Sequence, residues 1–219
     1  MHLVYIYPNA TEAMTKSVVS VAAKAVPQVK VTGLTNTKSP AAFEGLQDGA
    51  SAIPGVSECV PEAQAMAADA IVIACFDDTG LTEARNLATC PVLGIGHFAY
   101  TMASLLGGAF SVVTPVEAAV PVIENNIKSS GVCENGAQVR ARGLAVLAIE
   151  QGGAQVLDQL FRAILEAKAQ SKCKTVILGC AGMAAHHGAL SDKTGAVLIN
   201  GVVASAHLAQ STALFLAKG

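Results

Sequence analysis

Two cysteines occupy matching positions in the sequence, each at the end of a short apolar run. Cys75 ends the run IVIAC, and Cys180 ends the run VILGC. Turn-forming residues follow both runs, in FDDTG and in AGM. A free cysteine is most often a small buried hydrophobe. A thiol at the carboxyl end of a parallel strand, however, lies at the edge of the sheet where ligands bind. Both cysteines are therefore candidates for chemistry.

The surroundings of the two cysteines repeat as well. The spacing from Cys75 to the last glycine of PVLGIG equals the spacing from Cys180 to the last glycine of AVLING. A proline that follows an apolar run precedes each cysteine at nearly the same distance, Pro8 after LVYIY and Pro115 after FSVVT. This repetition indicates a duplicated α/β unit. If the two halves face each other, both thiols line one cleft.

Two thiols that flank one carbon atom can invert its configuration. A thiolate removes the proton from one face, and a thiol returns a proton to the other face of the planar carbanion. A single base could only return the proton to the face from which it came. The pKa of cysteine, about 8.5 in model compounds, can be lowered by helix amino termini, which we expect after both cysteines. Backbone amides of the two turns could also stabilise a developing enolate, so the chemistry requires no cofactor and no metal.

Apolar runs alternate with amphipathic segments along the whole chain, which predicts an α/β fold with a mostly parallel sheet. Short apolar runs predict strands at 3–7, 28–34, 70–75, 91–95, 110–114, 145–149, 175–180 and 196–199. Helical patterns cover 11–26, 81–88, 97–107, 115–130, 154–169, a segment from 182, and 202–219. A stretch rich in Gly, Pro and Ser from Thr35 to Gly55 predicts a loop, followed by a helix to Ala68.

Composition limits the possible functions. The chain has 219 residues, of which 52% are hydrophobic and 14% charged, and its net charge of -2 gives no basic surface for nucleic acid. Neither a leader peptide nor an uninterrupted apolar run of membrane-spanning length is evident, so we expect a soluble, cytoplasmic protein. The core is too large to need disulfides, so we expect all six cysteines to be reduced, namely Cys59, Cys75, Cys90, Cys133, Cys173 and Cys180.

Several segments together resemble the aspartate/glutamate/hydantoin racemase superfamily, over nearly the whole chain. They are YPNAT, ACFDDTGL, PVLGIG, SLLGGAFSVVT, LGCAGM and AVLINGVVASAHLA. The resemblance implies two similar Rossmann-like α/β domains, with parallel four- or five-stranded sheets related by a pseudo-twofold axis and the active site in the cleft between them. It implies a domain of residues 1–96 plus 202–219 and a domain of residues 97–201. It also implies cofactor-independent catalysis in which Cys75 and Cys180 act as acid and base.

The turns behind the cysteines indicate a branch of this superfamily. Amino-acid racemases usually carry Cys-Asn-Thr and Cys-Thr-His, whereas this chain has Cys75-Phe76-Asp77 and Cys180-Ala181-Gly182. That is similar to the hydantoin and allantoin racemases, which act on cyclic ureides. By the same resemblance we expect a homo-oligomer that binds a small-molecule substrate, and neither nucleic acid nor membrane. The expected substrate-binding residues are Pro8, Asn9, Thr11, Phe76, Asp77, Thr114, Gly179, Ala181 and Gly182.

Other functions remain open at this point. The same fold supports decarboxylation or isomerisation of other carbon acids, although the presence of both cysteines favours racemisation. A non-catalytic small-molecule-binding protein or a thiol redox protein is the alternative of a different class, but no Cys-x-x-Cys motif supports redox chemistry.

Three smaller motifs predict structural roles. Adjacent residues on a helix project in different directions, so His186 and His187 are expected at the surface rather than around a metal ion. Asp77 and Asp78 could cap the helix that follows them or contact the substrate. Gly94-Ile95-Gly96 lacks the third glycine of a dinucleotide site.

Overall fold

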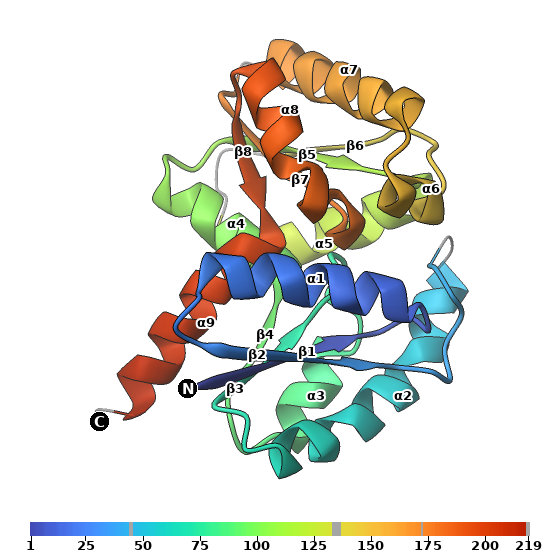
Figure 1. Ribbon diagram of the computed structural model, residues 1–219. Coiled ribbons are helices and arrows are strands. Elements are labelled where there is room, and N and C mark those ends of the chain that lie inside the picture. Colours follow the sequence, from blue (N-terminus) through green and yellow to red (C-terminus); the bar gives the residue numbers. More distant parts are fainter. Residues whose placement is uncertain (44–45, 133–136, 172, 218–219) are drawn as a thin grey trace.

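The computed structural model describes residues 1–43, 46–132, 137–171 and 173–217, and within them the chain forms two parallel sheets of four strands each (Figure 1). The first sheet has the order β2-β1-β3-β4, and the second has the order β6-β5-β7-β8. The second order repeats the first with every strand advanced by four, which confirms an α/β fold built from two similar halves. The strands are β1 (His2–Tyr7), β2 (Lys30–Thr35), β3 (Ala70–Ile73), β4 (Val92–Gly94), β5 (Phe110–Thr114), β6 (Gln138–Ala141), β7 (Thr175–Leu178) and β8 (Val197–Asn200).

Helices make the crossovers that parallel strands require. In the first half these are α1 (Glu12–Ala25), α2 (Leu46–Ala65) and α3 (Leu81–Leu87). In the second half they are η1 (Glu117–Ala119), α5 (Val120–Ser130), α6 (Val146–Gln151), α7 (Ala154–Ser171), η2 (Ala181–His186) and α8 (His187–Thr194). No helix in the described ranges has the length and apolar character needed to cross a membrane.

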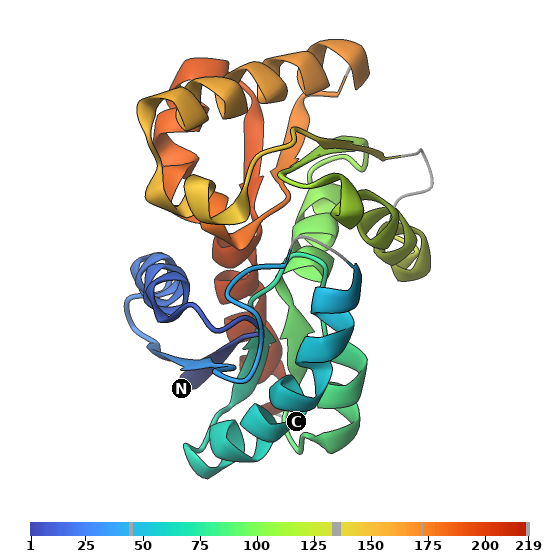
Figure 2. The ribbon, with the colours of Figure 1, turned by 90° about the vertical axis from the view of Figure 1, so that its right-hand side faces the viewer.

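Two helices join the halves. Helix α4 (Ile95–Leu105) leads from β4 to β5, and α9 (Gly201–Ala217) leads from β8 back to the first sheet. Helix α9 packs against α1 and α4 and contacts β1, β3 and β4. In Figure 2 it is the red helix that runs behind the strands of the first sheet. Helix α4 in turn contacts β7 and β8, so each joining helix leaves the last strand of one half and packs against the sheet of the other half.

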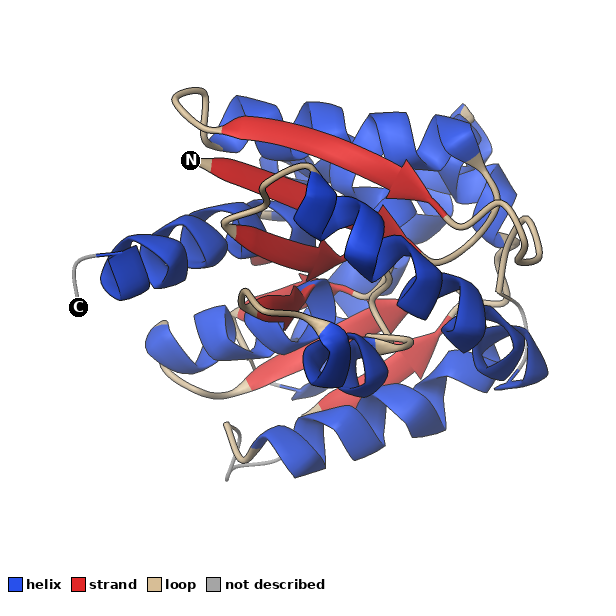
Figure 3. Ribbon diagram, turned by 90° about the horizontal axis from the view of Figure 1, so that it is seen from below, coloured by secondary structure: helices blue, strands red, loops and turns tan. Residues whose placement is uncertain are grey.

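Both faces of the first sheet are buried, as expected for a parallel sheet covered by helices (Figure 3). In β1, Leu3, Tyr5 and Tyr7 point to one face and Val4 and Ile6 to the other, and all five are buried. The face with the tyrosines belongs to one continuous apolar core that also contains side chains of β5, β7 and β8. The two halves are therefore joined by a shared core.

Two elements differ from the sequence prediction. The apolar run 145–149 is not a strand but begins α6, because Val146 and Ile149 are spaced to bury one face of a helix. The strand of this region is β6, a half-buried edge strand whose sequence QVRA gives no apolar run.

The predicted loop of residues 35–55 also ends earlier than expected. Helix α2 begins at Leu46 and contains Pro54 and Pro61. Each interior proline costs a helix about 3 kcal/mol. The buried face of α2, which includes Val56 and Val60, packs against the first sheet and offsets that cost.

Candidate active site

The two cysteines hold equivalent positions in the two halves. Each cysteine follows its strand after one intervening residue, Ala74 behind β3 and Gly179 behind β7. The backbone N–H of Ala74 donates to Ile6 O at 2.8 Å, and that of Gly179 donates to Val113 O at 2.8 Å. Ile6 and Val113 are matching residues of the central strands β1 and β5, so the same bond fixes both cysteine turns to their sheets.

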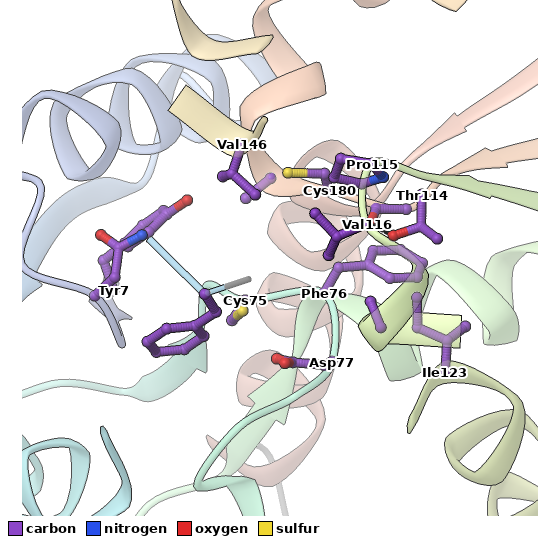
Figure 4. A pocket seen from close by; sticks show the side chains of 15 residues that line it. Tyr7, Cys75, Phe76, Asp77, Thr114, Pro115, Val116, Ile123, Val146 and Cys180 are labelled. Carbon is purple, nitrogen blue, oxygen red and sulfur yellow. Dashed lines mark hydrogen bonds between the residues drawn. The ribbon is translucent and has the colours of Figure 1, made fainter. Parts of the chain in front are cut away.

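Both thiols line one small cavity between the carboxyl ends of the two sheets. The sulfur atoms of Cys75 and Cys180 enter it from two sides, one from each half (Figure 4). The cavity has a volume of about 60 Å³. The remaining lining residues are mostly apolar, namely Tyr7, Asn9, Phe43, Phe76, Asp77, Thr114, Pro115, Val116, Ala119, Ile123, Val146, Gly179 and Ala181.

Burial raises the pKa of both thiols, against the expectation of lowered pKa values. Burial raises the pKa of Cys75 well above its usual value, and the charge and hydrogen bond of the Asp77 carboxylate add to this shift. Burial also raises the pKa of Cys180 to about 11, although the backbone N–H groups of Gly182 and Met183 act in the opposite direction. The predicted effect of the amides therefore exists, but desolvation outweighs it.

The structure brings six of the nine predicted substrate-binding residues to the cavity. Asn9, Phe76, Asp77, Thr114, Gly179 and Ala181 line it together with the thiols. Three lie just outside it. The carbonyl of Pro8 accepts a hydrogen bond from Asn36, the hydroxyl of Thr11 donates to Ala41 O, and the backbone N–H of Gly182 faces Cys180.

Tyr7 and Glu150 belong to the site although the sequence did not single them out. The buried Tyr7 ring lies beside both cysteines, whose charges contribute to raising the pKa of its hydroxyl after burial itself. Glu150 lies close to Gly182 and Cys180, and burial raises the pKa of its carboxyl. Tyr7 could be suspected because it ends β1 as Thr114 ends β5. Glu150 directly follows the run 145–149 and became apparent only in the structure, where that run begins α6 instead of forming a strand.

The remaining motifs have structural roles, and two of these roles differ from the prediction. His186 and His187 are not simply solvated, because each ring bonds to a backbone carbonyl, of Ile149 at 2.8 Å and of Leu198 at 3.0 Å respectively. Asp78 does act as a helix cap, but on the more distant α4 rather than on α3.

The described residues contain neither a metal-binding cluster nor a disulfide. No group of three potential metal-binding side chains occurs in the described part of the chain. The cysteines that can be placed, Cys59, Cys75, Cys90, Cys173 and Cys180, are all free thiols, and Cys133 lies outside the described residues.

Known proteins share this architecture and sequence over almost the whole chain. The model of the Asp/Glu/Hydantoin racemase family matches residues 3–209. A hydantoin racemase from Rhizobium meliloti is 36% identical over 212 residues, which cover 96% of this chain and 88% of that protein. An allantoin racemase structure from Klebsiella pneumoniae has a TM-score of 0.93 at 28% identity and covers 98% of this chain and 88% of that one. An allantoin racemase structure from Pseudomonas fluorescens has a TM-score of 0.90 at 29% identity, with 98% and 92% covered.

Proposed function

Because this chain belongs to the Asp/Glu/hydantoin racemase family, in its hydantoin and allantoin racemase branch, we propose that it is an isomerase that racemises a five-membered cyclic ureide. Cys75 and Cys180 exchange the proton of the stereocentre on opposite faces, and no cofactor takes part. The relatives named hydantoin racemase and allantoin racemase support the substrate class. The observation that carries the mechanism is the placement of two equivalent thiols, one from each half, on one small cavity.

The reaction matches the acidity of such a ring. The C5 proton of a hydantoin lies next to a carbonyl group, so the carbanion is an enolate, and a thiolate is basic enough to form it. One cysteine must be ionised when the proton is removed, and the other must be protonated in order to return one. Because the pKa values of Cys75 and Cys180 are raised, a protonated thiol is available as the proton donor, and the thiolate is the less populated form. We therefore expect turnover to rise with pH in the neutral and mildly alkaline range.

Single enantiomers provide the test. Pure enantiomers of allantoin and of several 5-substituted hydantoins are incubated with the protein, and optical rotation is followed against the spontaneous rate. The matched control is the variant in which Cys75 and Cys180 are both replaced by Ser. The proposal is supported if optical rotation is lost faster than the spontaneous rate with the wild-type protein but not with the double variant. Equal rates with both proteins, for every substrate, would reject it.

The quaternary and domain predictions are part of the same proposal. We propose a homo-oligomer, which light scattering after size-exclusion chromatography tests. We also propose domains of residues 1–96 plus 202–219 and of residues 97–201. The contact of α9 with β1, β3 and β4 supports its assignment to the first domain.

A further inference from the structure

The turn that carries Cys75 is tied to the start of α4 by Asp78. The carboxylate of Asp78 accepts hydrogen bonds from the backbone N–H groups of Gly96 at 3.0 Å and of His97 at 2.8 Å. Asp78 itself adopts a left-handed backbone conformation, with φ of 55°, which is unusual for a residue other than glycine. The turn is thus held in a strained form whose side chain reaches a helix that begins well beyond it in the chain.

Two glycines make this close approach possible. A side chain on Gly94 would overlap the Asp78 carboxylate, and a side chain on Gly96 would overlap the carbonyl oxygen of Phe76. The segment Gly94-Ile95-Gly96, which resembled part of a nucleotide motif, therefore serves to receive the cysteine turn. An internal carboxylate already occupies the position at this helix end where a phosphate would bind.

The second half makes the equivalent link with a different residue. Asn200 ends β8 and caps α9, because its Oδ1 accepts from the backbone N–H of Val202 at 3.0 Å. Its Nδ2 donates to the carbonyl of Ala184 at 3.0 Å, in η2, the segment directly behind Cys180. In the first half the turn reaches the helix, whereas in the second half the residue at the helix end reaches the turn.

The two links meet at one point. A side chain on Gly201, the first residue of α9, would lie 2.7 Å from the carbonyl oxygen of Ile95, the first residue of α4. The amino-terminal ends of α4 and α9 are therefore in close backbone contact. Asp78, Ile95, Gly96, His97, Asn200 and Gly201 form a continuous connection from one cysteine turn to the other, which we call the helix-end network.

We propose that Asp78 and Asn200 are positioning residues that fix the two thiols relative to one another through the helix-end network. This inference rests on the proposed function, since it concerns the two thiols named there. Proton transfer on two faces of one carbon requires both sulfur atoms to lie within proton-transfer distance of that carbon. A misplacement of about 1 Å can reduce turnover roughly a hundredfold. Each residue holds the turn of its own half, so each governs one thiol more than the other.

Two conservative substitutions separate the links. Asp78→Asn keeps one acceptor oxygen but faces the other amide with an NH₂ group, so it loosens the Cys75 turn. Asn200→Asp keeps the acceptor that caps α9 but removes the donor to Ala184, so it loosens the Cys180 turn. Asp158→Asn, at an exposed carboxylate on α7, makes the same chemical change away from the site and is the control.

Hydrogen exchange at the stereocentre of each pure enantiomer in deuterated water is the first measurement. The Cys180→Ser variant, which retains Cys75, identifies the enantiomer that Cys75 serves. Racemisation must have the same kcat/KM for both enantiomers, so the two substitutions are tested in the single-thiol variants, which exchange the proton without racemising. Asp78→Asn should slow the exchange by Cys180→Ser at least about tenfold more than the exchange by Cys75→Ser, and Asn200→Asp should do the reverse. The fall should be in the kcat of this exchange, with the KM of exchange changed less than threefold. Equal slowing of both enantiomers by both variants would overturn the proposal.

The second measurement needs no substrate, so its result is independent of the proposed function. Alkylation of each cysteine by iodoacetamide is followed by mass spectrometry, and Asp78→Asn should change the ratio of the Cys75 rate to the Cys180 rate at least threefold. An unchanged ratio in a folded variant contradicts the proposal even if the wild-type protein racemises nothing. If Asp78→Asn fails to fold, Gly94→Ala displaces the same carboxylate and must shift the ratio in its place.

Discussion

The thiol of Cys180 should ionise, and so become reactive, at a much higher pH than an ordinary thiol. With a pKa of about 11, only about one Cys180 side chain in a thousand is ionised at pH 8, against about one in four for a free cysteine. The higher basicity makes the rare thiolate about tenfold more nucleophilic. Alkylation of Cys180 at pH 8 should therefore be roughly twentyfold slower than that of a free thiol, before any steric effect of the cavity walls.

The assay is the alkylation rate of Cys180 as a function of pH. The protein and N-acetylcysteine are treated with iodoacetamide between pH 7 and 10, and the modified peptide is measured by mass spectrometry. The rate at Cys180 should rise about tenfold for each pH unit over the whole range, whereas the rate for N-acetylcysteine should rise less and less steeply towards pH 10. A plateau for Cys180 near pH 8.5 or below would refute the reasoning, because the amides of Gly182 and Met183 would then outweigh burial.

Three further outcomes are expected. Cys75→Ser and Cys180→Ser should each abolish racemisation, while proton NMR in deuterated water should show each variant exchanging the stereocentre of one enantiomer, and not the same one. Activity should survive exhaustive treatment with EDTA, and a loss that added metal restores would disprove a mechanism by thiols alone. Burial raises the pKa of Asp78 from 3.8 to about 7, and the titratable groups around it are Asp77, Arg85, His97 and Tyr100. As the pH falls, Asp78 is therefore protonated at a higher pH in the folded protein than in the unfolded chain. The contribution of this group is complete below pH 4 and lost as the pH rises through 7, so denaturant unfolding should show roughly 2–3 kcal/mol more stability from it at pH 5 than at pH 8, and Asp78→Asn should remove that difference.

The positions of the two cysteines could be predicted because they depend on local sequence. A buried parallel strand is a short apolar run that ends in turn residues, and this pattern identifies β3 and β7 without any knowledge of the fold. The repeated spacing then places Cys75 and Cys180 at equivalent strand ends. Most of the predicted substrate-binding residues also lie at strand ends, which explains why they line the cavity.

The features that the sequence did not predict depend on contacts between distant segments. Asp78 looks like a cap for the helix that begins three residues later, but the amides it bonds belong to α4, which lies beside the turn only once β3 and β4 have paired. The edge strand β6 buries too little to produce an apolar run. Phe43 reaches the cavity from a loop outside both sheets, and no periodic pattern marks it.

The two halves have the same topology but surround their thiols with different charges. After burial itself, the Asp77 carboxylate raises the pKa of Cys75 and its backbone N–H lowers it, whereas for Cys180 the carboxylates of Glu150 and Asp77 raise the pKa and two backbone N–H groups lower it. The two thiols therefore lie in different electrostatic surroundings although they hold equivalent positions in the fold. Because two enantiomers have equal free energies in water, kcat/KM must be the same in both directions of a racemisation, whatever the charges around the thiols. The asymmetry can then appear only as proportional differences, in which the enantiomer with the higher kcat also has the higher KM, so the duplicated fold does not have to carry a symmetric site.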